Sequence, residues 1–152
     1  MLNQADINKI KEIAKSFFEK TSFDLNLEFL NPEDETVFIK IKTEEPKVLI
    51  GQNGQTLTDI QRLLKAIIKK QMDGEFYIDI DVNDYKKKKT DYLREMAKES
   101  ADEVILTGRE KKLFPMSSYE RRIIHMALSE RSGIAVESVG QEPDRRIVIR
   151  PL

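Results

Sequence analysis

Residues 48–57 read Val-Leu-Ile-Gly-Gln-Asn-Gly-Gln-Thr-Leu, and this stretch decides how the chain folds. An apolar triplet runs into Gly51 and Gly54, and an amphipathic helix follows at once. Two glycines three apart allow a sharp turn and a close approach of a partner, and the helix N-terminus after them suits phosphate oxygens. A plain helix–turn–helix corner would give the same tetrapeptide, so taken alone the motif leaves both interpretations open. The helix is defined by apolar residues at spacings of three and four, with polar residues predicted to point away from them: Leu57, Ile60, Leu64, Ile67 and Ile68 against Gln61, Lys65, Lys69 and Lys70.

Composition limits the classes of protein that the chain can form. Its 152 residues are enough for one medium domain or two small ones. No apolar run is long enough for a membrane span, and no signal-peptide pattern opens the sequence, so we expect no membrane insertion. Cys is absent and there is one His, which excludes disulfides and predicts no metal site. We expect no cofactor.

Charge is unevenly distributed along the chain. Residues 1–83 hold 11 Lys and Arg against 15 Asp and Glu, whereas residues 84–152 hold 15 against 12. This asymmetry predicts two units and makes the second the stronger candidate for contacts to phosphates.

The pattern of residues 1–83 predicts helix, strand, strand, helix, loop, helix, strand. A helical stripe occupies residues 4–20, a short helix opens at Pro46, and the long helix runs to about Met72. Three segments alternate apolar and polar residues as half-buried strands do, the first two forming a hairpin: Phe23 to Phe29, Val37 to Ile41, and Phe76 to Val82. Three such strands need a covering layer of helices, so the fold class is α+β.

In this order, residues 1–83 resemble the bacterial (type II) KH domain, a three-stranded sheet with helices. The resemblance implies that Gly51, Gln52, Asn53 and Gly54 form the loop that grips a nucleic-acid backbone.

The second half, residues 84–152, reads as another small α+β unit. Asn83-Asp84 is predicted to cap a helix from Tyr85 to about Leu106, with a buried stripe of Tyr92, Leu93, Met96, Ala97, Ala101, Val104 and Ile105. A short extended piece is expected at residues 113–115, a helix from Ser117 or Ser118 to about Arg131, and strands at residues 134–136 and 147–149. Four lysines open the first helix, either as a solvated helix start or as contacts to phosphates: Lys86, Lys87, Lys88 and Lys89.

Arg121 and His125 form the second candidate site. They are four residues apart, so both side chains lie on one face of the predicted helix. An Arg fork can hold a phosphate bidentately, and a neighbouring imidazole can donate to the next oxygen or stack on a base. The alternative is that His125 packs locally while Arg121 pairs with a carboxylate such as Glu120 or Glu130.

The surroundings of this pair strongly resemble the Arg-x-x-x-His domain of the Jag family, the SpoIIIJ-associated, KhpB-type bacterial RNA-binding proteins. The resemblance extends over nearly the whole chain and is carried by residues 113–116, 119–125 and 140–149, with Asp81, Tyr85 and the Thr107-Gly108-Arg109 helix stop. It implies a KH domain (1–83) followed by an Arg-x-x-x-His-type domain (84–152), in a cytoplasmic protein that binds single-stranded RNA, or single-stranded DNA. The implied contacts in the second domain centre on Arg121 and His125, and we add Arg122, Arg145 and Arg146.

Two departures from the family qualify this expectation. Its Gly-x-x-Gly loop usually has basic residues between the glycines, whereas here they are Gln52 and Asn53, which removes Coulombic attraction to phosphate. Members also often carry an extra N-terminal domain, and these 152 residues start at the KH helix, so a role of that extension is not expected of them.

We therefore expect a non-enzymatic single-stranded RNA-binding protein. The first alternative is a protein-interaction adaptor with weakened KH binding to RNA, whose partner could be another KH protein; the neutral loop and the acidic first half favour it. The second is a nuclease using His125 with Glu120 or Glu142, for which the sequence offers no clear partner or metal site.

Overall fold

The computed structural model describes all 152 residues and divides into two units, Met1–Lys86 and Lys87–Leu152. The division falls within a helix that begins at Tyr85. The domain boundary after residue 83 stays a prediction. No helix combines the length and the apolar character needed to cross a membrane.

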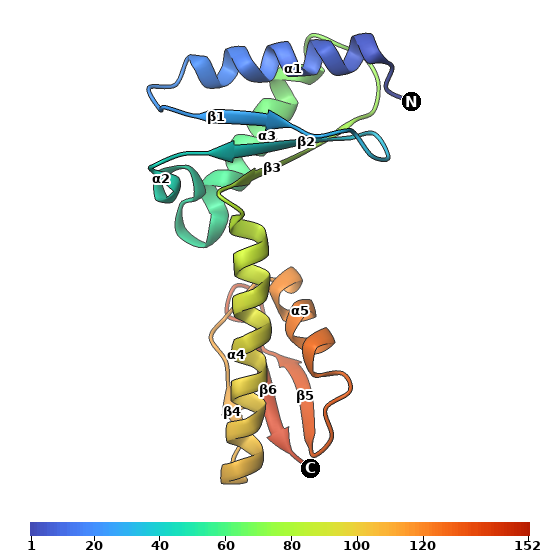
Figure 1. Cartoon of the computed structure of the whole chain (residues 1–152). Helices are drawn as coiled ribbons and strands as arrows, with labels where there is room; N and C mark the ends of the chain where they lie inside the picture. The colour runs from blue at the N-terminus through green and yellow to red at the C-terminus, as the bar shows by residue number, and fades with distance from the viewer. The chain divides into compact units, whose positions relative to one another are not determined.

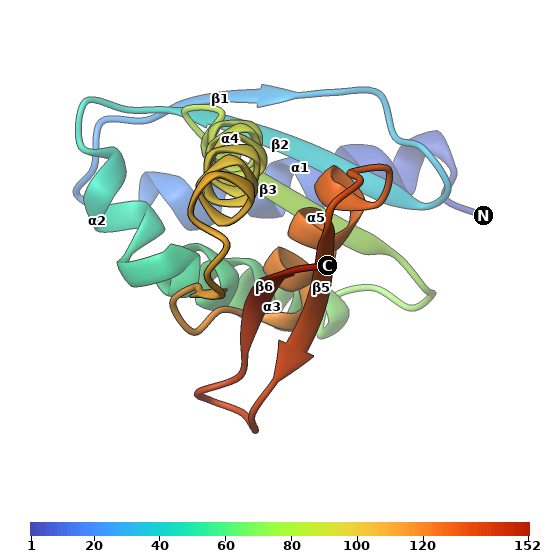
Figure 2. The ribbon, with the colours of Figure 1, turned by 90° about the horizontal axis from the view of Figure 1, so that it is seen from below.

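The first unit is a three-stranded mixed sheet with its long helices on one side (Figures 1 and 2). The strand order is β1-β2-β3; β1 and β2 form the predicted antiparallel hairpin, and β3 lies parallel to β2. A single turn of 3₁₀-helix, η1, covers the loop between two helices. The elements are α1 (Gln4–Glu19), β1 (Asn26–Phe29), β2 (Thr36–Lys42), α2 (Pro46–Ile50), η1 (Gln52–Gly54), α3 (Gln55–Lys69) and β3 (Tyr77–Val82).

The core of this unit follows from the predicted periodicities. The alternating residues of β2 and β3 bury one face of the sheet, and the apolar stripes of α1 and α3 cover that face. Burying that apolar surface is the main stabilising contribution, roughly 1.5–3 kcal/mol for each large side chain. The fully or nearly fully buried members include Ile10, Ala14, Phe18, Val37, Ile39, Ile41, Leu64, Ile68, Ile78, Ile80 and Val82.

Three predictions for this unit were wrong in detail. The first strand begins at Asn26, not Phe23, because Asn26 pairs with Lys42 at the end of β2 and earlier residues have no strand residue opposite them. Helix α3 ends at Lys69, short of Met72. Gln61 does not point away, since its Oε1 accepts a hydrogen bond from the Ile80 N–H at 2.9 Å and ties α3 to β3.

The cap before α4 (Tyr85–Thr107) also differs from the prediction. The Asn83 side chain is used up by Thr43, whose N–H and C=O it bonds at 3.0 and 2.8 Å. Instead, Asp81 Oδ1 accepts from the backbone N–H of Val82 at 2.9 Å and of Lys86 at 3.2 Å. Asp81 therefore satisfies an N–H in the first turn of α4, where a carboxylate is favoured.

The second unit places α4 and α5 against an antiparallel sheet of order β4-β6-β5 (Figure 1). Ser117 caps α5 as predicted, in a capping box: its side chain accepts from the Glu120 N–H, and Glu120 accepts from the Ser117 N–H. The remaining elements are β4 (Lys111–Lys112), α5 (Ser118–Leu128), β5 (Ile134–Val139) and β6 (Arg146–Pro151).

The core of the second unit uses a narrower stripe of α4 than predicted. Tyr92 and Ile105 are 57% and 47% exposed, so both lie outside it. The predicted extended piece at 113–115 is also shifted, because β4 is Lys111–Lys112, although the Leu113 N–H still bonds Ile147 O at 2.9 Å. Helix α5 stops at Leu128, before Arg131. The buried cluster comprises Leu93, Ala97, Ala101, Val104, Leu113, Met116, Ile123, Ile124, Leu128, Ile134, Ile147 and Ile149.

Candidate nucleic-acid interface

The Gly-x-x-Gly loop has a backbone that requires glycine at both ends. Gly51 has φ 71° and ψ −175°, a combination almost confined to glycine, and Gly54 is left-handed at φ 78° and ψ 12°. Asn53 also has a positive φ, 53°, which Asn tolerates better than most residues. Gln52 and Asn53 are exposed between the two glycines. The loop thus offers backbone and amide groups to solvent at the N-terminal end of α3.

Two side chains hold the loop closely from within the first unit. Thr56 crowds Gly51, so that an added Cβ would lie 2.7 Å from Thr56 Cβ and 2.9 Å from Thr56 N. Tyr85 lies over Gly54, with its Cε1 3.1 Å from the position of a Cβ. Neither neighbour could be read from the Gly-x-x-Gly motif itself. Val48, on α2 directly before the loop, is 54% exposed and supplies an apolar surface beside it.

The four lysines at the start of α4 do not form one cluster of free charges. Lys86 pairs with Asp79, and Lys89 pairs with Glu120 at 3.4 Å. Lys87 and Lys88 are exposed and make no ion pair. Two of the four charges are thus partly neutralised by carboxylates, while two remain open to an anion.

Arg121 is buried, in contrast to an ordinary surface cation. Its guanidinium donates from Nη1 to Met116 O at 2.6 Å, and Nη2 lies 2.7 Å from Glu142 Oε1. Its side chain is 9% exposed, whereas that of Glu142 is 60% exposed. The open alternative of a carboxylate partner is therefore realised, but with Glu142 rather than Glu120 or Glu130. Sequence reasoning missed this partner because it lies 21 positions further along the chain.

Three other guanidiniums of this unit make no ion pair. Arg145 Nε donates to Ser138 Oγ at 2.8 Å, and Arg146 Nε donates to the backbone O of Asp144 at 3.2 Å. Arg122 is exposed on α5. The structure brings Arg145 close to Arg121 through the backbone, because the Met116 N–H bonds Arg145 O at 3.1 Å while Met116 O accepts from Arg121.

His125 lies one turn after Arg121 and borders a separate open hollow of about 530 Å³. The hollow lies between the end of α5 and β5, and its other lining residues are Met126, Leu128, Ser129, Arg131, Ile134 and Val136. Arg131 pairs with Asp102 on α4, so its charge is partly neutralised. The Arg121 and His125 side chains therefore have different surroundings, despite their common helix face.

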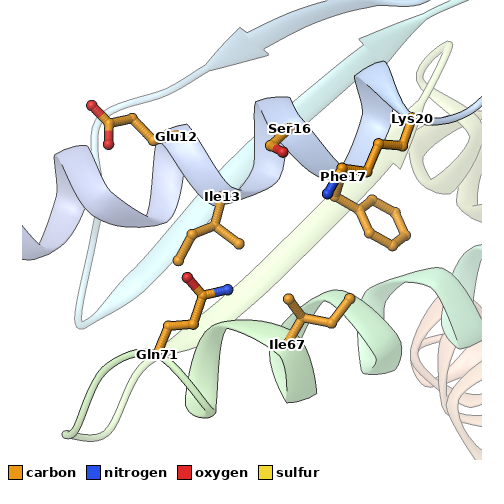
Figure 3. Close-up of a pocket in the computed structure, with 7 residues that line it drawn as sticks. All are labelled: Glu12, Ile13, Ser16, Phe17, Lys20, Ile67 and Gln71. Atoms are coloured by element: carbon orange, nitrogen blue, oxygen red, sulfur yellow. The ribbon is translucent and has the colours of Figure 1, made fainter.

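A second hollow, of about 430 Å³, lies between α1 and α3 (Figure 3). Figure 3 shows Ile13 and Phe17 facing Ile67 across it, with Glu12 and Lys20 at its edges. Ile67 is about 18 Å of helical rise from the start of α3, so this hollow is far from the Gly-x-x-Gly loop. It belongs to neither predicted contact site.

Comparison with known proteins agrees with this arrangement. The profile of the KH domain family matches residues 9–90, and that of the Arg-x-x-x-His domain family matches residues 91–151. The chain belongs to the KH domain family. An Arg-x-x-x-His domain follows, which is the domain order of the Jag family, so the resemblance predicted from the sequence is confirmed.

Three curated relatives carry the name RNA-binding protein KhpB. The protein from Clostridium symbiosum is 32% identical over 144 residues, covering 93% of this chain and 64% of the relative. The one from Bacillus subtilis (strain 168) is 33% identical over 116 residues, covering 75% and 56%, respectively. The one from Streptococcus pneumoniae serotype 2 (strain D39 / NCTC 7466) is 31% identical over 147 residues, covering 95% and 45%. The two-domain chain therefore spans between 45% and 64% of the length of these relatives.

Proposed function

We propose that this two-domain chain binds single-stranded RNA and acts by binding rather than by catalysis. The proposal is supported by the domain order, by the printed names of the relatives, and most directly by the loop from Gly51 to Gly54. Glycine at both ends lets the backbone approach phosphates, and the exposed residues between them face solvent ahead of α3.

On the KH side, the loop binds the backbone without a charge of its own. Gln52 and Asn53 offer amide donors, and the positive end of the α3 dipole favours an anion there. A KH loop of this kind clamps about four nucleotides, with apolar side chains against the bases. Val48 is the exposed apolar residue placed for that role.

In the Arg-x-x-x-His domain, the cations without ion pairs supply the Coulombic attraction. These are Arg122, Arg145 and Arg146, with Lys87 and Lys88 at the start of α4. His125 adds a ring that can stack on a base, since its hollow is walled by Met126 and Val136. Lys86 and Lys89 contribute less to attraction because Asp79 and Glu120 already pair with them.

The test is the change in RNA affinity when a charge is added to the loop. Gln52→Lys restores the basic character that the loop lacks, and we expect affinity for mixed single-stranded RNA to rise about threefold to tenfold at low salt. Asn31→Lys is the matched control, because it adds the same charge in an exposed connection between β1 and β2. An equal response of the two variants in fluorescence polarisation would show that the loop does not contact RNA.

The same experiment addresses the second candidate function, a protein-interaction adaptor. The uncharged loop favours it, because such a loop gives RNA little attraction. No RNA binding by either wild type or Gln52→Lys would support the adaptor, with another KH protein as the partner to test first. End-labelled RNA should stay intact with the wild-type chain in the presence or absence of magnesium; its cleavage would contradict the non-enzymatic proposal.

A further inference from the structure

The ion pair between Arg121 and Glu142 is unequal in its two partners. Arg121 cannot leave, since its side chain is 9% exposed and its Nη1 is held by the Met116 carbonyl at 2.6 Å. Glu142 can leave, since its side chain is 60% exposed and its one ion pair is with Nη2 of Arg121. It stands in the turn of residues 141–144, between β5 and β6, which is closed by the Asp144 N–H to Gln141 O bond of 2.8 Å. A fixed cation thus has a movable carboxylate partner.

A carboxylate and a phosphate use the same donors of a guanidinium. Both accept the paired N–H groups of an Arg fork, and Arg is favoured wherever either anion is recognised. The position of Glu142 Oε1, 2.7 Å from Nη2, is one that a phosphate oxygen would take on the same nitrogen. If the carboxylate turned out to solvent, the buried guanidinium would lose its only acidic partner and would favour another anion there.

The turn also brings two guanidiniums that no carboxylate neutralises. Arg145 and Arg146 follow directly on Glu142, Pro143 and Asp144 in the sequence, and neither forms an ion pair. An anion replacing Glu142 would therefore meet a locally cationic surface, in which three arginines stand beside Asp144 alone.

We propose that Glu142 occupies the phosphate position of Arg121, and that single-stranded nucleic acid binds the Arg-x-x-x-His domain by displacing this carboxylate. This inference rests on the proposed function and specifies its regulation. Glu142 acts as an internal competitor, which weakens phosphate binding and makes the Arg121 contact available only to a ligand that other cations already hold. Arg121 thus pairs with an acid in the free protein and with phosphate in the complex.

Glu142→Gln tests the competitor directly. The amide oxygen can still accept from Arg121, so the buried guanidinium keeps a partner, but the competing charge is gone. We expect affinity for a labelled oligouridylate of about 20 nucleotides to rise roughly threefold to tenfold at low salt. The log–log salt slope should become steeper by about 0.7, because the phosphate now displaces a counterion instead of the carboxylate.

Asp144→Asn is the matched control. It removes one negative charge from the same turn, two residues away, and its side chain has no contact with Arg121. Its effect on affinity should be less than about twofold at moderate salt, since exposed charges are screened over about 10 Å. If Glu142→Gln raises affinity no more than Asp144→Asn does, or lowers it, Glu142 only supports the fold and the competitor proposal is wrong.

A further variant covers loss of folding. If the unfolding temperature of Glu142→Gln falls sharply, Glu142→Asp replaces it, because the shorter side chain keeps the charge but holds Nη2 less closely; a rise in affinity supports the proposal and a fall overturns it. Failure of this inference is distinguishable from failure of the proposed function. In the first case the wild-type chain still binds the oligouridylate; in the second, none of the variants binds it at any salt concentration, which overturns both.

Discussion

Gly51→Ala should destabilise the first unit well beyond the usual effect of adding a methyl group. A side chain at φ 71° and ψ −175° occupies a region almost reserved for glycine, which costs about 1–3 kcal/mol. The new Cβ would also lie 2.7 Å from Thr56 Cβ and 2.9 Å from Thr56 N. Rotation of the Thr56 side chain moves neither atom, so the backbone must shift, at about 1–3 kcal/mol for overpacking. Together these effects predict a loss of roughly 2–5 kcal/mol in the free energy of unfolding.

Gly74→Ala separates the two causes. Gly74 has φ 114° but no atom within 4 Å of the added Cβ, so this control carries the backbone penalty without the collision. We expect it to lose about 1–2 kcal/mol, leaving a difference of about 1–3 kcal/mol for the contact with Thr56.

The assay is urea unfolding followed by NMR. Amide signals of β2 report the first unit and those of β6 the second, so each unit is followed in the same sample. With a slope near about 2 kcal/mol per molar urea, the midpoint of the β2 signals should fall by about 1–2 M in Gly51→Ala. A midpoint equal to that of Gly74→Ala would refute the role of the Thr56 contact. The result also governs tests of binding: aspartate at Gly51 and Gly54 would perturb folding as well as RNA contact, because both have positive φ and Gly54 is buried.

Three further predictions concern the second unit and its connection to the first. Ser117→Ala removes one half of the α5 capping box and should reduce stability by about 1 kcal/mol, measured as earlier urea unfolding of the β6 signals; unchanged β6 signals would contradict it. The log–log salt slope for single-stranded RNA should lie at roughly −2 to −4, since only a handful of cations lack ion pairs; a slope near zero would mean that stacking dominates. Insertion of a long Gly/Ser linker after Asn83 should weaken binding only for RNAs long enough to reach both domains, through a lower effective concentration; equal weakening for short RNAs would refute bivalent binding.

The sequence was sufficient to predict both α+β units, because their apolar periodicities are local. Strand β2 and helix α3 each bury the residues that their alternation or helical spacing indicates. The same rule failed at the ends of elements. Phe23 and Leu25 alternate as strand residues do, yet β1 starts at Asn26, because pairing depends on where β2 ends. Tyr92 and Ile105 lie at the edges of the α4 stripe, and the width of the surface that α4 covers is set by its neighbours in the fold.

The sequence also located both candidate contact sites, but it could not determine the state of their charges. The spacing of Arg121 and His125 predicted a shared helix face, which says nothing about what lies opposite that face. Only the tertiary structure brings Glu142 against Arg121 and walls His125 with Val136 of β5. Likewise, four consecutive lysines cannot indicate which of them meet a carboxylate; Asp79 and Glu120 decide that from other elements. Periodicity acts over a few neighbouring residues, whereas ion pairing depends on segments that only folding brings together.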